Sequence, residues 1–362
     1  MNEPRTGYLV VADITGYTAY LSDSELEHAR DSLNAFLELL VEYTRRPLLI
    51  SRLEGDAVFS YAFDEQVLEG QILVDLIEST YLAFRKARQM MVINTTCTCR
   101  ACANIPNLDL KFFLHHGRYA FQDVGDYKEL VGTDVNLIHR LAKNTIVATT
   151  GIRAYAAYTA AVMAAIGLAE FAASLTEHTE QYDHIGQVKI FVQDLDALWQ
   201  QRRDAQRYEV RPENTLYRTD AVFPLPPAEL WPYLTHPKHR AIVHGSIRQE
   251  LIEQPNGRIG VGAVYECVHS TYKSRNTIVD WHPFEQYTTV ETTPVPRTYA
   301  YVTYLLEPVD AGTRLAYVAS RAYGPPLLRQ LSSLTAAPVL ARRMRKSFAT
   351  FLDYINEEIA TG

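Results

Sequence analysis

A short apolar run near the N-terminus ends on a carboxylate and turns into a helix-like segment. Residues Tyr8 to Ala12 have the length and character of a buried strand, Asp13 follows them, and Gly16 marks the turn. A strand that delivers Asp13 beside free helix N–H groups can hold a cation next to a phosphate. The same pattern also suits an aspartate that only caps the following helix. Later stretches of the chain decide between these two interpretations.

Helical and strand-like patterns alternate over the first two hundred residues. The turn sequence Glu54-Gly55-Asp56 lies between two strand-like runs and predicts a hairpin. A second hairpin is predicted around Gly117, and the uncharged stretch 154–169 is interpreted as a packed helix. The other predicted elements are helices over 19–46 and 65–91, a loop entering a helix over 131–141, and a late strand over 188–192.

This order of elements predicts a ferredoxin-like βαββαβ core with additions. In such a sheet the N-terminal strand and the first hairpin lie side by side, so we expect Asp13 and Asp56 to meet at one edge. Two carboxylates that share divalent cations are stable together and can orient a triphosphate.

The second half of the chain has the pattern of an antiparallel sheet. A short helix bounded by prolines covers 226–237, and a long helix rich in Leu, Ala, Met and Phe covers 327–359. Short alternating runs separated by turn residues predict strands over 216–222, 247–253, 263–269, 275–281, 287–293, 299–307 and 313–320. The whole chain is therefore predicted to be α+β, with an apolar pocket between a curved sheet and the long helix.

Length and composition support two domains and argue against several functions. A chain of 362 residues exceeds the usual size of one domain. We expect domains over 1–200 and 215–362, joined by a charged linker over 201–214. The net charge of −7 argues against a nucleic-acid partner. Because no secretory signal and no stretch able to span a bilayer is apparent, we expect a cytoplasmic protein with reduced thiols.

Three motifs in the first domain occur in a fixed order. They are Asp13-Ile-Thr-Gly-Tyr-Thr18, Arg52-Leu-Glu-Gly-Asp56 and Gly132-Thr-Asp-Val-Asn136-Leu-Ile-His-Arg140. In order and spacing they resemble the signature stretches of class III nucleotidyl (adenylate/guanylate) cyclases. Such a resemblance implies that the domain converts an NTP to a 3′,5′-cyclic NMP and pyrophosphate.

The resemblance implies a metal and phosphate site at the end of the first strand. Two divalent cations, Mg²⁺ or Mn²⁺, would be bound by Asp13, Asp56 and the carbonyl of Ile14. The triphosphate would face the backbone N–H groups of the turn and the helix start, which belong to Thr15, Gly16, Tyr17 and Thr18.

The third motif implies the catalytic residues and the oligomeric state. Asn136 would orient the ribose, and Arg140 would stabilise charge on the phosphorus centre in the transition state. In this family the two halves of a site come from different subunits, which implies a homodimer. The base is left open, because adenine-selective members carry a lysine where this chain has Arg52 and an aspartate where it has Thr133, and Asp134 stands one position late.

Three cysteines are clustered in the interruption after the second helix. Cys97, Cys99 and Cys102 could together wrap a soft metal such as zinc, but a closed site needs a fourth ligand. His115 or His116 could supply it, and so could a partner chain. The alternative interpretation is a reduced turn that binds no metal.

Structural motifs also place the second domain in a known class. The helix from Pro226 to Trp231, the stretch 260–265, the stretch 277–283 and the final helix resemble the START/polyketide-cyclase-like (SRPBCC) helix-grip superfamily. This resemblance implies a pocket for a hydrophobic small molecule. Five aromatic residues either line that pocket or pack in the core, namely Tyr265, Trp281, Tyr299, Tyr301 and Tyr304.

The sequence thus predicts a homodimeric nucleotidyl cyclase with a C-terminal domain that senses a hydrophobic ligand. Two alternatives stay open. A catalytically silent regulator that binds nucleotide is motivated by Arg52 and Thr133. The other alternative is that the second domain is itself the enzyme and acts on a polyketide- or lipid-like substrate. The base, the sensed ligand and the direction of regulation are not determined by the sequence.

Overall fold

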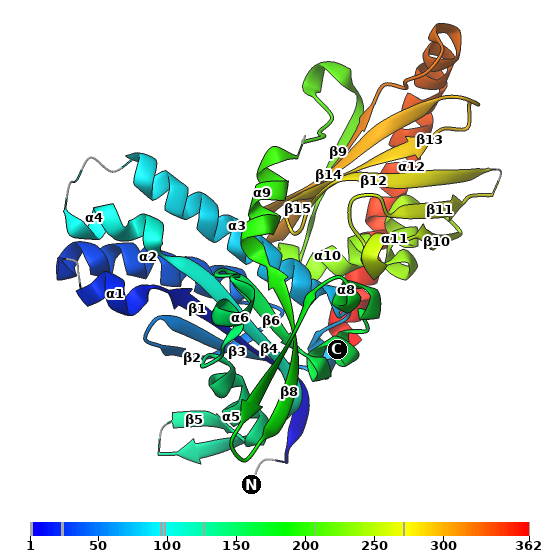
Figure 1. Cartoon of the computed structure of the whole chain (residues 1–362). Helices are drawn as coiled ribbons and strands as arrows, with labels where there is room; N and C mark the ends of the chain where they lie inside the picture. The colour runs from blue at the N-terminus through cyan, green and yellow to red at the C-terminus, as the bar shows by residue number, and fades with distance from the viewer. Residues whose placement is uncertain are drawn as a thin grey trace. The chain divides into compact units, whose positions relative to one another are not determined.

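The chain divides into two compact units, residues 1–205 and 206–362 (Figure 1). The computed structural model describes residues 3–22, 25–94, 97, 99–125, 127–205, 207–270 and 272–361. Among these residues, none of the helices combines the length and the apolar character that a membrane span requires. Each unit is described in turn.

The first unit is built on a mixed sheet of eight strands. Seven of them follow the order β2-β3-β1-β4-β6-β8-β7, while β5 pairs only with β4. Strands β4 and β6 run parallel, and the other neighbours run antiparallel. The bounds are β1 Arg5–Thr15, β2 Leu49–Glu54, β3 Ala57–Phe63, β4 Asp109–Val124, β5 Tyr127–Val131, β6 Tyr155–Thr159, β7 Thr176–Tyr182 and β8 Gly186–Asp194.

Helices cover both faces of this sheet. On one face α2 and α3 pack together through Phe36 and Phe84, whose ring centroids lie 4.6 Å apart. On the other face α5 shares a core cluster with Leu9 and Val11 of β1. The helices of the unit are α1 Tyr17–Ser22, α2 Leu26–Thr44, α3 Gln71–Asn94, α4 Arg100–Asn104, α5 Thr133–Leu141, α6 Ile146–Thr150, α7 Ala160–Ile166, α8 Ala169–Ala173 and α9 Leu195–Asp204, with 3₁₀ turns at Asp64–Gln66 and Ile105–Asn107.

This two-sided cover explains the apolar run at the N-terminus. The side chains from Leu9 to Ala12 are all buried, so β1 lacks the alternation of a half-exposed strand. The predicted hairpin at Gly55 is present, with β2 and β3 on either side of it.

Two predictions for the first unit were wrong. Strand β4 runs straight through Gly117, and the reversal lies at Gly125, between β4 and β5. Gly117 allows a close approach instead, because an added Cβ would lie 2.4 Å from Cγ of Asp134. The stretch 154–169 is not one helix: it begins as the fully buried strand β6, and Thr159 then caps α7 by accepting a hydrogen bond from the Val162 N–H.

The second unit is a seven-stranded antiparallel sheet with a long C-terminal helix, α12 Pro326–Thr361. Its strand order is β10-β11-β12-β13-β14-β15-β9. The bounds are β9 Thr215–Phe223, β10 Arg248–Glu253, β11 Val264–Val268, β12 Lys273–His282, β13 Gln286–Thr292, β14 Tyr299–Val309 and β15 Gly312–Ser320. Together with the mixed sheet of the first unit, this architecture confirms the predicted α+β class.

Two short helices and α12 close the core of the second unit. They are α10 Pro227–Thr235 and α11 Pro237–His244. The sequence predicted only α10, because Pro237 was interpreted as the end of a helix. In the structure Pro237 is the first residue of α11. Phe351 of α12 is fully buried, and its ring lies 5.1 Å from that of Phe223 in β9. Further 3₁₀ turns cover Pro212–Asn214 and Pro255–Gly257.

Candidate functional site

Two aspartates converge at the end of β1. Asp13 pairs in register with Ala57 of β3 on one side and with Lys111 of β4 on the other. Asp56 closes the β2–β3 turn, and its carbonyl accepts a hydrogen bond of 3.1 Å from the Ile14 N–H. Burial and, second, the charge of Asp56 raise the pKa of Asp13 to about 6, while Lys111 opposes the shift. The charge of Asp56 thus acts on the carboxyl of Asp13.

The donor set at this position suits a hard divalent cation. Burial also raises the pKa of Asp56, so both carboxylates lack solvent for their charge. A cation bound between them would supply the missing counter-charge, and carboxylate and carbonyl oxygens are the ligands that Mg²⁺ prefers. Lys111 was missed by sequence reasoning, because its place beside Asp13 follows from the β1–β4 register alone.

The turn after β1 is held in a conformation that only glycine adopts easily. Gly16 has φ of +89°, and an added Cβ would lie 3.0 Å from the carbonyl oxygen of Asn107. Helix α1 begins directly afterwards, and the Tyr20 N–H donates to the Gly16 carbonyl at 2.9 Å. In the described part of the chain, the buried hydroxyl of Thr15 has no hydrogen-bond partner.

Arg52 belongs to a polar cluster that the sequence did not reveal. Its Nε donates to Glu54 at 2.5 Å, and Nη1 lies 3.7 Å from Glu129. Nδ1 of His139 approaches the other oxygen of Glu54 at 3.3 Å, and the imidazole lies against Phe59 with centroids 4.8 Å apart. Burial lowers the pKa of His139, and the carboxylate of Glu54 opposes that shift.

The start of α5 is fastened to β4 through Asp134. One carboxylate oxygen accepts the Arg118 N–H at 2.7 Å, and the other lies 3.1 Å from Nε2 of His115. Thr133 precedes it as the first residue of α5 and is exposed. The carboxylate of Asp134 thus serves the contact between β4 and α5.

Asn136 and Arg140 lie four residues apart on the exposed side of α5. Residues at this spacing share one face of a helix. Nη1 of Arg140 donates to the carbonyl of Asp183, in the connection between β7 and β8, at 3.1 Å. Both side chains are therefore presented to solvent on a surface next to that connection.

The three clustered cysteines have a histidine beside them, and it is neither His115 nor His116. Nδ1 of His115 contacts Thr159 at 2.9 Å, and Nε2 of His116 contacts Asp64 at 2.8 Å, so both rings are engaged elsewhere. The ligand atoms of Cys97, Cys99, Cys102 and His28 all lie within 4.8 Å of one another. This His/Cys cluster could bind a metal.

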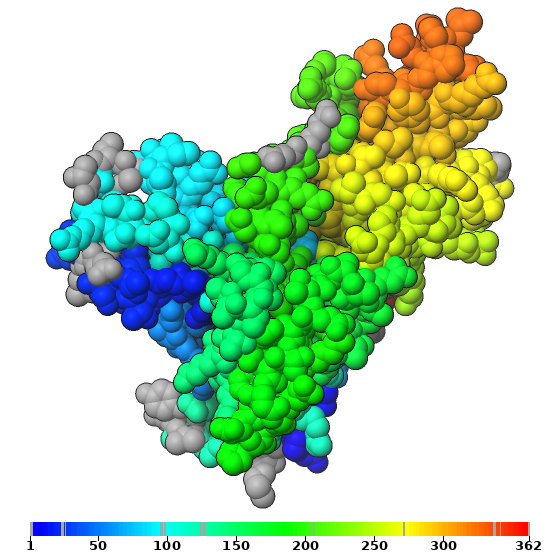
Figure 2. All heavy atoms as spheres, in the orientation of Figure 1, coloured from blue at the N-terminus to red at the C-terminus, as the bar shows by residue number. Residues whose placement is uncertain are grey.

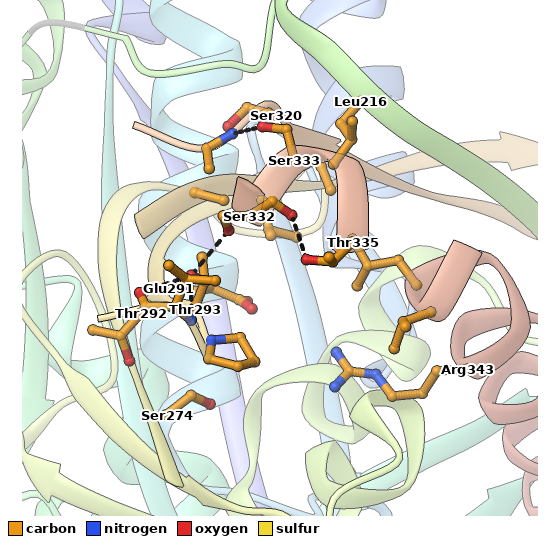
Figure 3. A pocket seen from close by; sticks show the side chains of 18 of the residues that line it. Leu216, Ser274, Glu291, Thr292, Thr293, Ser320, Ser332, Ser333, Thr335 and Arg343 are labelled. Atoms are coloured by element: carbon orange, nitrogen blue, oxygen red, sulfur yellow. Dashed lines mark hydrogen bonds between the residues drawn. The ribbon is translucent and has the colours of Figure 1, made fainter. Parts of the chain in front are cut away.

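The second unit contains a cavity of about 280 Å³ between its sheet and α12. None of the five aromatic residues proposed from the sequence lines it; Tyr265, Trp281 and Tyr304 belong to the packed core instead. The apolar part of the wall includes Leu216, Val302, Ala319, Val339 and Leu340. Figure 3 shows the side chain of Arg343 pointing into the cavity from α12, toward the side on which Ser274 and Glu291 lie.

A few polar groups converge on this cavity. Arg343 donates to the hydroxyl of Tyr272 at 2.8 Å, while its Nε is buried and has no partner among the described residues. Asn276 is 1% exposed, and its side-chain oxygen is likewise unpartnered in the described chain. Burial raises the pKa of Glu291, whereas Arg240 and Arg343 oppose that shift. The cavity is apolar with a small polar end, as ligand pockets are.

Comparisons of the sequence match different families in the two halves. Residues 33–150 match a family model described as a protein of unknown function (DUF2652). Residues 215–355 match the model for polyketide cyclase / dehydrase and lipid transport, so the second unit is an SRPBCC domain. Over 97 residues, 27% of this chain, the sequence is 34% identical to an uncharacterized protein of Mycobacterium tuberculosis. The match spans less than half of that protein, 45% of its length.

Comparisons of the structure find nucleotidyl cyclases. The guanylyl cyclase Cya2 is 16% identical, with a TM-score of 0.42, over 53% of this chain and 92% of that one. The adenylyl cyclase CyaB from P. aeruginosa is 16% identical, with a TM-score of 0.38, over 53% and 96% of the two chains. A bacterial light-regulated adenylyl cyclase is 13% identical, with a TM-score of 0.41, over 55% and 58%. Each of these matches is a likeness to a solved cyclase at low identity, with a TM-score below 0.5.

Proposed function

We propose that the N-terminal unit is a nucleotidyl cyclase that converts an NTP to a 3′,5′-cyclic NMP and pyrophosphate. The observation that carries the proposal is the convergence of Asp13 and Asp56 at the end of β1, beside the turn at Gly16. The pair has lost part of its solvation, which a divalent cation would compensate. Two cations bound there would activate the 3′-hydroxyl and neutralise the triphosphate.

The roles of the protein groups follow from where each is held. Asp13, Asp56 and the Ile14 carbonyl would hold the cations, and the backbone N–H groups of residues 15–18 would bind the phosphates. The 3′-hydroxyl releases its proton to water, and the 3′-oxygen attacks the α-phosphorus and forms the new P–O bond. The bond from that phosphorus to the α,β-bridging oxygen breaks, and pyrophosphate leaves with the bonding electrons. The N–H groups of the turn orient the departing phosphates for that displacement.

The remaining groups would come from a second copy of the chain. Asn136 and Arg140 are exposed on one face of α5, where they are available to a partner protomer. In the proposed homodimer, Asn136 positions the ribose and Arg140 stabilises the charge that develops on the phosphoryl oxygens. Each dimer then contains two composite sites.

The base would be read by the cluster around Arg52. Glu54 and His139 supply an acceptor and a titratable ring beside the guanidinium, over the face of Phe59. Thr133, at the exposed start of α5, would add a hydroxyl. We assign Asp134 a positioning role, because both of its oxygens are used between β4 and α5.

The activity test is a screen of the four NTPs with Mg²⁺ and with Mn²⁺, read by mass spectrometry of the products. We expect a cyclic NMP from at least one NTP, and a loss of about 10²-fold or more in Asp56→Ala and in Arg140→Ala. The control is Lys86→Ala, which changes an exposed residue of α3 and should retain activity. Nucleotide-dependent thermal stabilisation without product would identify a silent nucleotide-binding regulator instead.

We further propose that the second unit binds an amphipathic ligand with an acidic group. Arg240 is fully buried and Arg343 is partly buried, and the charges of both oppose the rise that burial causes in the pKa of Glu291. An acidic ligand head beside Arg343 would use its free Nε, and the tail would occupy the apolar wall.

Calorimetric titration of decanoate and decanol into the full chain tests this ligand class. We expect decanoate to bind more tightly than decanol, and we expect Arg343→Met to lose that preference. Arg342→Met changes the neighbouring, exposed arginine and should keep it. Equal binding of both probes to the wild-type chain would refute the acidic-head proposal, and tighter binding of decanol would also refute it.

A further inference from the structure

The His/Cys cluster gathers four possible metal ligands at a spacing near that of a tetrahedral site. Nδ1 of His28 lies 3.2 Å from Sγ of Cys99 and 3.7 Å from Sγ of Cys97, and all four ligand atoms lie within 4.8 Å of one another. Tetrahedral zinc with ordinary bond lengths places its sulfur and nitrogen ligands about 3.5–3.8 Å apart. Four side chains from two segments thus already surround one point.

We propose that His28, Cys97, Cys99 and Cys102 bind one Zn²⁺ as a closed structural site. Three thiolates and one imidazole form a donor set that is characteristic of structural zinc. With four protein ligands no position is left for a substrate or water. Nothing in this proposal depends on the cyclase reaction, so the two can fail independently.

The backbone around the cluster supports the cysteines as zinc sites commonly do. Sγ of Cys99 accepts the N–H of Cys102 at 3.4 Å, so the sulfur serves as the N-cap of α4. The carboxylate of Glu25 accepts the N–H of Ala101 at 3.1 Å and ties the same turn to the start of α2. Such outer hydrogen bonds fix the orientation of metal ligands.

The proposed zinc would stabilise an element that is too short to be stable alone. Helix α4 has five residues, and isolated helices of that length do not form in water. It packs against α2 and α1 at the surface of the first unit, where the cyan and blue segments meet in Figures 1 and 2. A metal shared by His28 of α2 and the three cysteines would hold α4 in that place.

The segment that the proposed zinc would hold leads to the turn that follows β1. Helix α4 continues directly into the 3₁₀ turn Ile105–Asn107, and the Asn107 carbonyl oxygen is the nearest atom, at 3.0 Å, to a Cβ added at Gly16. Ile105 and Ala101 are buried and anchor this segment in the unit. Loss of zinc should therefore loosen the support of the turn at Gly16 as well as α4 itself.

Metal analysis of the full chain, purified from cells grown with zinc, tests the site. We expect about one zinc per chain, and a decrease of at least about 10-fold in content for Cys97→Ser, Cys99→Ser and Cys102→Ser. Cys267→Ala is the matched control, because Cys267 lies in the core of the second unit; it should retain the zinc. Substituted Co²⁺ should show the intense absorption of tetrahedral thiolate coordination.

The fourth ligand is tested separately with two variants of His28. His28→Gln should weaken zinc binding about 10- to 100-fold, measured by competition with a chelator. His28→Cys should bind zinc well, because four cysteines also form a structural site. His28→Gln with the affinity of the wild-type chain would remove His28 from the site. A wild-type chain without zinc, together with a weak octahedral Co²⁺ spectrum, would overturn the site itself.

Discussion

At the scale of single residues, the carboxyl of Asp13 makes folding depend on pH. Its pKa is raised from 3.8 to about 6, mainly by burial. The folded state therefore holds the proton at pH values where the unfolded chain releases it, and the free energy of unfolding falls as the pH rises through that window. Without a bound cation, ionised Asp13 destabilises the folded protein at neutral pH.

We expect Asp13→Asn to stabilise the metal-free protein at neutral pH. The gain in free energy of unfolding should be about 1–2 kcal/mol near pH 7.5, after allowance for solvent screening, and it should disappear near pH 4. Urea unfolding in chelator at both pH values measures it. Mn²⁺ should raise the melting temperature of the wild-type chain but not of the variant. A variant that Mn²⁺ stabilises as much as the wild type would remove Asp13 from the cation site.

A second residue-scale prediction concerns Gly117. Its added Cβ would lie 2.4 Å from Cγ of Asp134, so Gly117→Ala must displace the start of α5 or bend β4. We expect a loss of about 1–3 kcal/mol in the free energy of unfolding. Gly260→Ala, where nothing lies within 4 Å, should change stability by less than about 0.5 kcal/mol.

A double-mutant cycle on the same contact separates two effects of Gly117→Ala: the clash with Asp134 and the loss of backbone freedom. If the Asp134 side chain is the obstacle, Gly117→Ala should cost less in an Asp134→Ala background than in the wild type. Equal costs in both backgrounds would mean that the close approach to Asp134 does not explain the glycine.

At the scale of elements, the second unit depends on one face of α12. Phe351 is fully buried against Phe223 of β9, whereas Leu334 on the same helix is 70% exposed. Phe351→Ala should lower the stability of the second unit by about 3–5 kcal/mol, because it leaves a cavity in the core. Leu334→Ala should change it by less than about 0.5 kcal/mol. Thermal unfolding of the full chain measures both, and similar effects would contradict this packing.

Elements also differ in how well local patterns predicted them. Strand β12 was predicted because buried and more exposed residues alternate along most of it, whereas β15, whose last six residues are all buried, was marked by the turn residues Asp310 and Gly312. Strand β6 was missed, because all five of its residues are buried and its alanines suit a helix equally well. Burial on both faces removes the periodicity that distinguishes a strand from a helix.

At the scale of the whole molecule, the proposed composite site predicts complementation. Asp56→Ala and Arg140→Ala should each be inactive alone. In an equal mixture that exchanges subunits freely, half of the dimers are mixed, and each mixed dimer has one intact site. Activity should therefore return to about a quarter of the wild-type value. The cyclase assay on co-expressed variants measures it, and mixtures as inactive as the single variants would argue that all four residues act within one chain.

The sequence by itself determined the fold class, the three motifs and most strand positions. These features follow from local patterns along the chain, namely the spacing of apolar residues, the glycines at turns, and polar residues at fixed separations. It also indicated Asp13 and Asp56 as neighbours, because a hairpin beside the first strand places them at one end of the sheet.

Only the tertiary structure decided which side chains face one another across long separations. His28 stands 69 residues before Cys97 and joins it only because α4 packs on α2. Lys111 reaches Asp13 through the register of β1 and β4, and Arg343 reaches the cavity of the second unit because α12 packs across the sheet. Such contacts depend on register and packing, which are set by the burial of the whole core and leave no local pattern in the chain.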